Sequence, residues 1–136
     1  MALRYIEVFL SIVRDNQIVQ VALTAVLLLM LLDVIFGVAN AILHKEFSSE
    51  KMRHGIAHKC ASFGFMLVGI IVDGCILGGF DLGYTAPVLT AICAYLAIME
   101  IASLLETFCK MNPAFENSAL FKLLASVQVI KEAHED

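Results

Sequence analysis

The sequence predicts an all-α membrane protein with three transmembrane helices and an amphipathic segment at each end. Its 136 residues are 60% hydrophobic, whereas soluble domains usually contain about 45–50% apolar residues. Only 16% of the residues are charged, and the mean hydropathy is +0.87. Three apolar runs also reach the length of about 20 residues that a helix needs to cross a bilayer core. One domain is expected for a chain of this length.

The membrane domain is expected over residues 17–109. The link FDLGY between its last two spans is very short, so these spans must form an antiparallel hairpin, with Gly78, Gly79 and Gly83 as turn formers. Pro87 suits a first helical turn. The three predicted spans cover about residues 18–43, 60–79 and 85–108.

The first apolar run is expected to remain as a span. Ala39-Asn40-Ala41 resembles a signal-peptidase site. However, the run exceeds the usual apolar length of about 7–15 residues in signal peptides. Residues 1–16 before it also carry mixed charge, which is atypical of a signal peptide.

Both ends of the chain are predicted to be amphipathic. Residues 1–16 form either an interfacial helix or an extension of the first span, and their polar face comprises Arg4, Glu7, Ser11 and Arg14. The tail, residues 110–136, is expected to form a cytoplasmic helix that starts near Ser118, a plausible N-cap. Its apolar side comprises Leu120, Leu123, Leu124, Val127 and Ile130.

Basic residues predict the orientation in the membrane, because Lys and Arg collect in cytoplasmic loops. Residues 44–59 are interpreted as a cytoplasmic basic loop, and Lys110 close to the third span shares its side. The N-terminus and FDLGY then face outward. The basic loop contains Lys45, Lys51, Arg53 and Lys59.

Each predicted span carries small or polar residues along one helical face, called here a seam. Charged groups are costly in a bilayer and usually face a bundle interior or water. The seams consist of Asp33, Gly37, Asn40 and His44, of Ser62, Gly69 and Asp73, and of Glu100, Ser103, Glu106 and Thr107.

The carboxyl groups in the seams have no Lys or Arg within the predicted spans to pair with. They are therefore expected to be protonated, to hydrogen-bond across helices, or to border water in an assembly. One alternative is that they only hold a single three-helix bundle together. Three spans are too few to enclose a sizeable water path, which favours self-association. Gly74-x-x-x-Gly78 is a further close-packing pattern.

Several classes of function are not expected. The net charge of −4 includes four acids inside apolar runs, and without a basic stripe no nucleic-acid partner is indicated. His54, His58 and Cys60 have helical ligand spacing, but the basic neighbours of these residues oppose zinc binding. The four widely spaced cysteines do not indicate a disulfide framework. No nucleophile or nucleotide motif accompanies the acids, so neither an enzyme nor a cofactor is expected.

Three stretches resemble the holins of phage lysis and toxin secretion. The first is Asp33-x-x-x-Gly37-x-x-x-Ala41. The second is SSEKMRHGIAHK, with Ser48, Ser49, Lys51, Gly55 and Lys59 placed as in that family. The third, EIASLLET, is similar to the family's Glu-x-x-Ser-x-x-Glu-Asn, with Thr107 in place of Asn. The resemblance covers about residues 25–110, and the following FCKMNP lacks the family's usual glycine.

The resemblance implies a small phage protein of the bacterial cytoplasmic membrane. Such proteins oligomerise abruptly into lesions that release an endolysin or a toxin. The expected partners are further copies of the chain, the bilayer and an antiholin. Two alternatives stay open, namely an ion or small-solute transporter subunit that uses its buried carboxylates, and an antiholin-type regulator.

Overall fold

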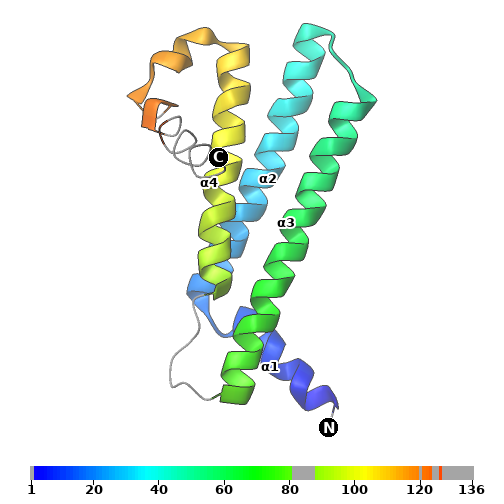
Figure 1. Cartoon of the computed structure of the whole chain (residues 1–136), viewed down its shortest axis with the longest axis vertical. Helices are drawn as coiled ribbons and strands as arrows, with labels where there is room; N and C mark the ends of the chain where they lie inside the picture. Colours follow the sequence, from blue (N-terminus) through cyan, green and yellow to red (C-terminus); the bar gives the residue numbers. More distant parts are fainter. Residues whose placement is uncertain (1, 81–87, 120, 124–125, 127–136) are drawn as a thin grey trace, which may run out of the picture.

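The structure, a computed structural model, describes residues 2–80, 88–119, 121–123 and 126, and every element within them is helical. Three of the four long helices stand side by side, and the first helix, α1, crosses one end of this bundle (Figure 1). The four helices are α1 (Ala2–Arg14), α2 (Gln17–His44), α3 (Ser49–Cys75) and α4 (Val88–Met111). A π-helical turn, η1 (Ile76–Phe80), continues α3, and a 3-10 turn, η2 (Pro113–Asn117), follows α4.

Within the part of the chain that the structure describes, three helices are long and apolar enough to cross a membrane, as predicted. They cover Gln17–His44, Ser49–Gly78 and Val88–Met111. The α3 helix begins at Ser49, before the expected start of the second span near residue 60. Ser48 provides the N-cap by accepting a hydrogen bond from the Lys51 amide at 3.4 Å. The predicted basic loop is therefore largely helix.

The α1 helix is separate from α2, so it is no continuous extension of the first span. The chain breaks at Asp15 and Asn16, and the Asn16 Oδ1 accepts hydrogen bonds from the amides of Ile18 (3.0 Å) and Val19 (3.3 Å). This is the N-cap arrangement, which starts a new helix. Beside it, the hydrogen bond from Arg14 lowers the pKa of Asp15, so this exposed pair stays ionised at neutral pH.

The α4 helix joins the other two spans, since α2 and α3 both pack on it. Residues of α2 at intervals of seven face this contact, as in coiled-coil packing. Two of them, Val19 and Val26, are buried in the apolar core, and the next two are Asp33 and Asn40. The packing pattern thus carries polar side chains into the interior. The core residues are Ile12, Val19, Val26, Met30, Met66, Leu89, Ile92, Cys93 and Leu96.

Gly69 allows α3 to approach α4 closely. A Cβ at this position would lie 3.1 Å from the Leu89 Cα and 3.0 Å from the Ile92 Cδ1. We expect Gly69→Leu to separate the two helices and to lower the unfolding free energy in detergent by about 1–3 kcal/mol through overpacking. Gly55→Leu is the matched control, because nothing lies within 4 Å of its Cβ position. Equal unfolding midpoints for the two variants would contradict the close contact.

Part of the predicted hairpin and tail lies outside the described residues. This applies to residues 81–87, including Gly83 and Pro87, and to Leu120, Leu124, Val127 and Ile130 of the tail. At the start of the tail, Ala119 is helical and the Ser118 hydroxyl accepts a hydrogen bond from the Phe121 amide at 3.2 Å, as an N-cap does.

Candidate functional site: an ion-pair cluster between the spans

Three ionisable residues from three different helices lie at one level of the bundle. Lys59 is ten residues from the start of α3, while Asp33 and Glu100 are each eleven residues from the ends of α2 and α4. With a rise of about 1.5 Å per residue, each lies about 15–17 Å from the same end of the bundle. Because α3 runs antiparallel to α2 and α4, the helices bring these side chains together.

The ion-pair cluster consists of Asp33, Lys59, Glu100 and Ser103. The Lys59 Nζ donates to the Asp33 Oδ2 at 2.9 Å and forms a second, shorter ion pair with the Glu100 Oε2. The Ser103 hydroxyl donates to the Asp33 Oδ1 at 2.7 Å. Only 2% of the Glu100 side chain is exposed, and 16% of Asp33 and of Lys59. The cluster therefore ties all three spans together inside the bundle.

The cluster corrects the expectation that the seam acids have no cation to pair with. An unpaired charge in an apolar interior is strongly destabilising, and pairing with added hydrogen bonds offsets that cost. Two carboxyl groups share one ammonium, so the cluster carries one net negative charge unless a carboxyl is protonated. Asp33 and Glu100 thus form their ion pairs within one copy of the chain.

Lys59 stands directly before the apolar run that begins at Cys60, a position that favours a loop. Hydropathy alone marks that position as the end of a span. A better signal was the helical spacing that runs from Lys59 through Ser62 and Met66, together with Ser48 as a candidate N-cap. Neither signal predicts which helix the Lys59 side chain faces.

Asp73 has a different role from the one expected for a seam residue. It is 3% exposed, and its two carboxylate oxygens accept hydrogen bonds from the backbone amides of Val88 (3.2 Å) and Leu89 (3.0 Å). These are the first amides of α4, which no residue of α4 itself can satisfy. A carboxylate on α3 therefore caps the following span, where it also meets the positive end of the helix dipole.

The other seam residues of α2 are less completely paired. Gly37 is exposed, with nothing within 4 Å of its Cβ position. The Asn40 Oδ1 is buried and, among the described residues, has no hydrogen-bond partner. The His44 Nδ1 lies 3.0 Å from the Asn40 carbonyl oxygen of its own helix. Past Asp33, the side chains of the α2 seam therefore make no hydrogen bond to another helix among the described residues.

The remaining seam residues of α3 and α4 lie outside the cluster. Ser62 is buried and donates to the His58 carbonyl of its own helix at 3.1 Å. Glu106 is exposed and pairs with Lys110 at 2.6 Å, and Thr107 is half-buried. The α4 seam is thus split between an interior part and an exposed part.

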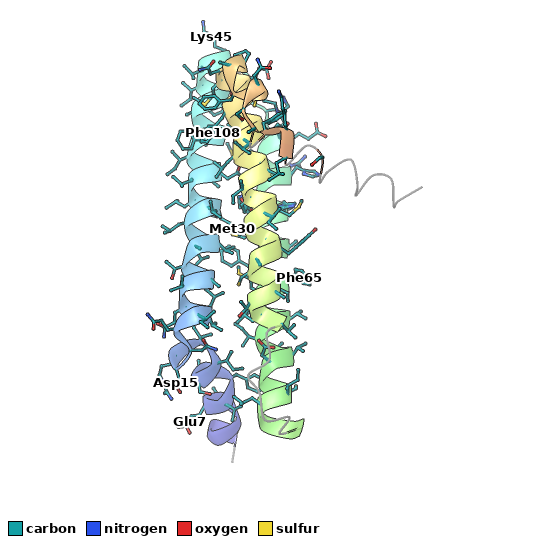
Figure 2. The ribbon with its side chains drawn as sticks, turned by 90° about the vertical axis from the view of Figure 1, so that its left-hand side faces the viewer. Glu7, Asp15, Met30, Lys45, Phe65 and Phe108 are labelled. Atoms are coloured by element: carbon teal, nitrogen blue, oxygen red, sulfur yellow. The ribbon has the colours of Figure 1, made fainter. Side chains whose placement is uncertain are left out.

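The other members of the predicted basic loop are exposed near one end of the bundle. Lys45 has a left-handed backbone (φ 54°) and ends α2, a position where Gly or Asn is common. Lys51 pairs with Glu46 at 3.4 Å, and Arg53 is exposed. Figure 2 shows Lys45 at the end opposite Glu7 and Asp15.

The two glycines of the close-packing pattern contact α1. A Cβ on Gly74 would overlap the Phe9 ring, and a Cβ on Gly78 would lie 3.3 Å from the Val8 Cγ1. Figure 1 shows α1 crossing this end of α3. In a single copy, the chain's own first helix therefore covers this face at Gly74, which is buried, whereas Gly78 stays exposed beside Val8.

Among the described residues, no three His, Cys, Asp or Glu side chains come together in a way that could hold a metal ion. The chemistry of the site is therefore that of charged and hydrogen-bonding groups placed between apolar helices.

Comparison with known proteins identifies the family. A family model described as "Bacteriophage holin family" matches residues 16–126, which include all three spans and the whole ion-pair cluster. Searches of curated proteins and of solved structures gave no significant match. This family is not enzymatic. Membership of the chain in this family agrees with its three spans and with its holin-like motifs. The chain is therefore a multi-pass membrane protein that belongs to the bacteriophage holin family.

Proposed function

We propose that this protein assembles with copies of itself in the bacterial cytoplasmic membrane and forms lesions through which an endolysin or a toxin escapes. The observation that carries this proposal is the ion-pair cluster of Asp33, Lys59 and Glu100, which joins three otherwise apolar spans. Charged groups at this depth usually mark a path for water or ions.

Side chains fill the interior of the described spans in a single copy, which supports assembly. Large apolar side chains such as Val26, Met30 and Leu96 fill the interior. At the same time, only 11% of the most apolar window of α2 is buried within the chain. Most of that helix is therefore left to contact lipid or other copies.

The proposed mechanism follows from the cost of buried charge. In the closed form, Lys59 neutralises half of the charge on Asp33 and Glu100, and the ion pairs with the Ser103 hydrogen bond stabilise what remains inside the bundle. Separating the three helices in lipid would leave these charges unpaired, which is strongly unfavourable. They can separate only where water replaces the lost partners, so opening and the creation of a water-filled lumen are coupled.

The orientation remains part of the proposal. The exposed Lys45, Lys51 and Arg53 lie towards one end of the bundle, and excess Lys and Arg favours the cytoplasmic side. We place that end and the tail in the cytoplasm and α1 outside. An antiholin partner would act by preventing assembly.

Inducing the protein alone in a bacterium that also contains a cytosolic cell-wall hydrolase tests the function. We expect an abrupt loss of turbidity, with the hydrolase recovered outside the cytoplasm. Cells with either protein alone are the controls, and the membrane protein alone should stop growth and abolish the membrane potential. Depolarisation with the hydrolase retained would favour the transporter alternative, and absence of both effects would favour an antiholin.

A further inference from the structure

We propose that α1 is a removable cover on α3, which holds each copy in an unassembled form until α1 leaves the surface around Gly74 and Gly78. A second copy of the chain then takes the place of α1 and docks through its own α3. This inference rests on the proposed self-assembly and adds the contact that restrains it.

The contact between α1 and α3 is close and specific. The Phe9 ring lies so close to Gly74 that a Cβ atom at position 74 would overlap it. One helical turn further, Val8 lies next to Gly78. Ile12, the next residue of the same α1 face, is 8% exposed and belongs to the apolar core. Two side chains of α1, Val8 and Phe9, therefore lie on a surface formed by the end of α3 and by η1.

The same surface suits a second transmembrane helix. Small residues four positions apart let two helix backbones approach closely in a membrane, where dispersion contacts drive association. α1 occupies this surface in the single copy, so α1 and a neighbouring α3 cannot occupy it together. Docking of α1 and assembly through this face are mutually exclusive.

The α1 helix is also attached in a way that allows it to leave. A pocket of about 560 Å³, whose wall includes Ser11, Asn16 and Asp73, lies between α1, the start of α2 and the end of α3. Along this pocket, α1 is therefore not in full contact with α2 and α3. Sparse packing lowers the free energy needed for local opening.

After leaving α3, α1 would remain at the membrane. Ile6 and Leu10 are 52% and 58% exposed in the docked form and give α1 a second apolar stripe. An amphipathic helix of this kind lies stably in the bilayer interface. The break at Asp15 and Asn16 can serve as the hinge, because α2 keeps its own N-cap there.

A disulfide between α1 and α3 tests the cover directly. In the double variant Val8→Cys, Gly78→Cys, the new thiols lie within reach of a disulfide, because the Val8 Cγ1 is 3.3 Å from the Cβ position of Gly78. Cys60 and Cys75, which are exposed, are replaced by alanine in all variants to prevent other cross-links. Cells are treated with diamide, loss of free thiols is followed by maleimide labelling, and a thiol reductant is then added.

We expect the oxidised double variant to show neither lysis nor chemically cross-linked oligomers until the reductant is added, after which it should behave like the same double variant kept reduced throughout. Oligomers that form with the disulfide intact would overturn the proposal, even if no lysis occurred. Failure of the thiols to join would overturn it too, because it would contradict the docked position of α1. A parent protein that forms oligomers but releases no hydrolase would count against the proposed function alone.

A second variant avoids cysteine chemistry. Phe9→Ala should weaken the docking of α1 and bring oligomer formation and lysis forward, at equal amounts of protein. Leu10→Ala is the matched control, since Leu10 points away from the core and is 58% exposed. If Phe9→Ala assembled at the same time as Leu10→Ala, α1 would not restrain assembly.

Discussion

Replacing Lys59 with methionine is expected to lower the unfolding free energy by about 3–5 kcal/mol, the usual cost of removing one partner from a buried ion pair. Methionine keeps much of the side-chain volume but leaves Asp33 and Glu100 as two uncompensated carboxylates, of which Glu100 is almost fully buried. Denaturant titration of the purified protein in detergent micelles, followed by circular dichroism, measures the change.

A control and a rescue variant separate this effect from a general effect of charge. Lys51→Met removes the same charge from α3, but Lys51 is 75% exposed and its pair with Glu46 contributes little. The triple variant Lys59→Met, Asp33→Asn, Glu100→Gln should recover most of the lost stability, because no buried charge then remains unpaired. Equal midpoints for Lys59→Met and Lys51→Met would rule out a stabilising cluster.

The second large effect is expected at Asp73. Asp73→Leu removes both acceptors from the first amides of α4, and each unsatisfied buried amide costs about 1–3 kcal/mol. Asp73→Asn retains one amide oxygen as an acceptor and should lose less than Asp73→Leu. Unfolding in micelles measures the two losses, and hydrogen exchange at Val88 and Leu89 should increase in the same order.

This experiment also distinguishes a cap from a lumen residue. A cap requires an acceptor but no negative charge, so Asp73→Asn should keep the timing of lysis close to that of the parent. If Asp73→Asn retained stability yet abolished lysis, the carboxylate would act in the lesion rather than at the start of α4. The two roles thus predict different results for one substitution.

The ion-pair cluster and the cap by Asp73 give the acidic residues of the seams a different role from the one predicted. From the spacing, Asp33, Asp73 and Glu100 were expected to meet other copies of the chain and water. In the single copy, each of the three already has a partner within the chain. In the proposed mechanism, opening exchanges these partners for water, and this exchange gives opening an energetic barrier.

The number and type of spans were predictable from the sequence because hydropathy is a local property. Runs of apolar residues near 20 in length can bury their backbone in lipid only as helices. The motifs in α2, the start of α3 and α4 were also readable, and they led to the family that the comparison identified. The helical faces of Asp33 and Glu100 followed from spacing alone.

Only the tertiary structure decided which groups meet across helices. Lys59 stands at the edge of an apolar run, and its partners lie 26 and 41 residues away. The cap of α4 by Asp73 and the contact of Phe9 with Gly74 likewise join segments that are separate in the chain. Spacing along one helix determines a face, but the depth and rotation at which three helices pack determine what that face touches. The sequence by itself therefore determined that this protein is a three-span membrane helix bundle with charges in its interior, and the packing of the helices decided how those charges are held.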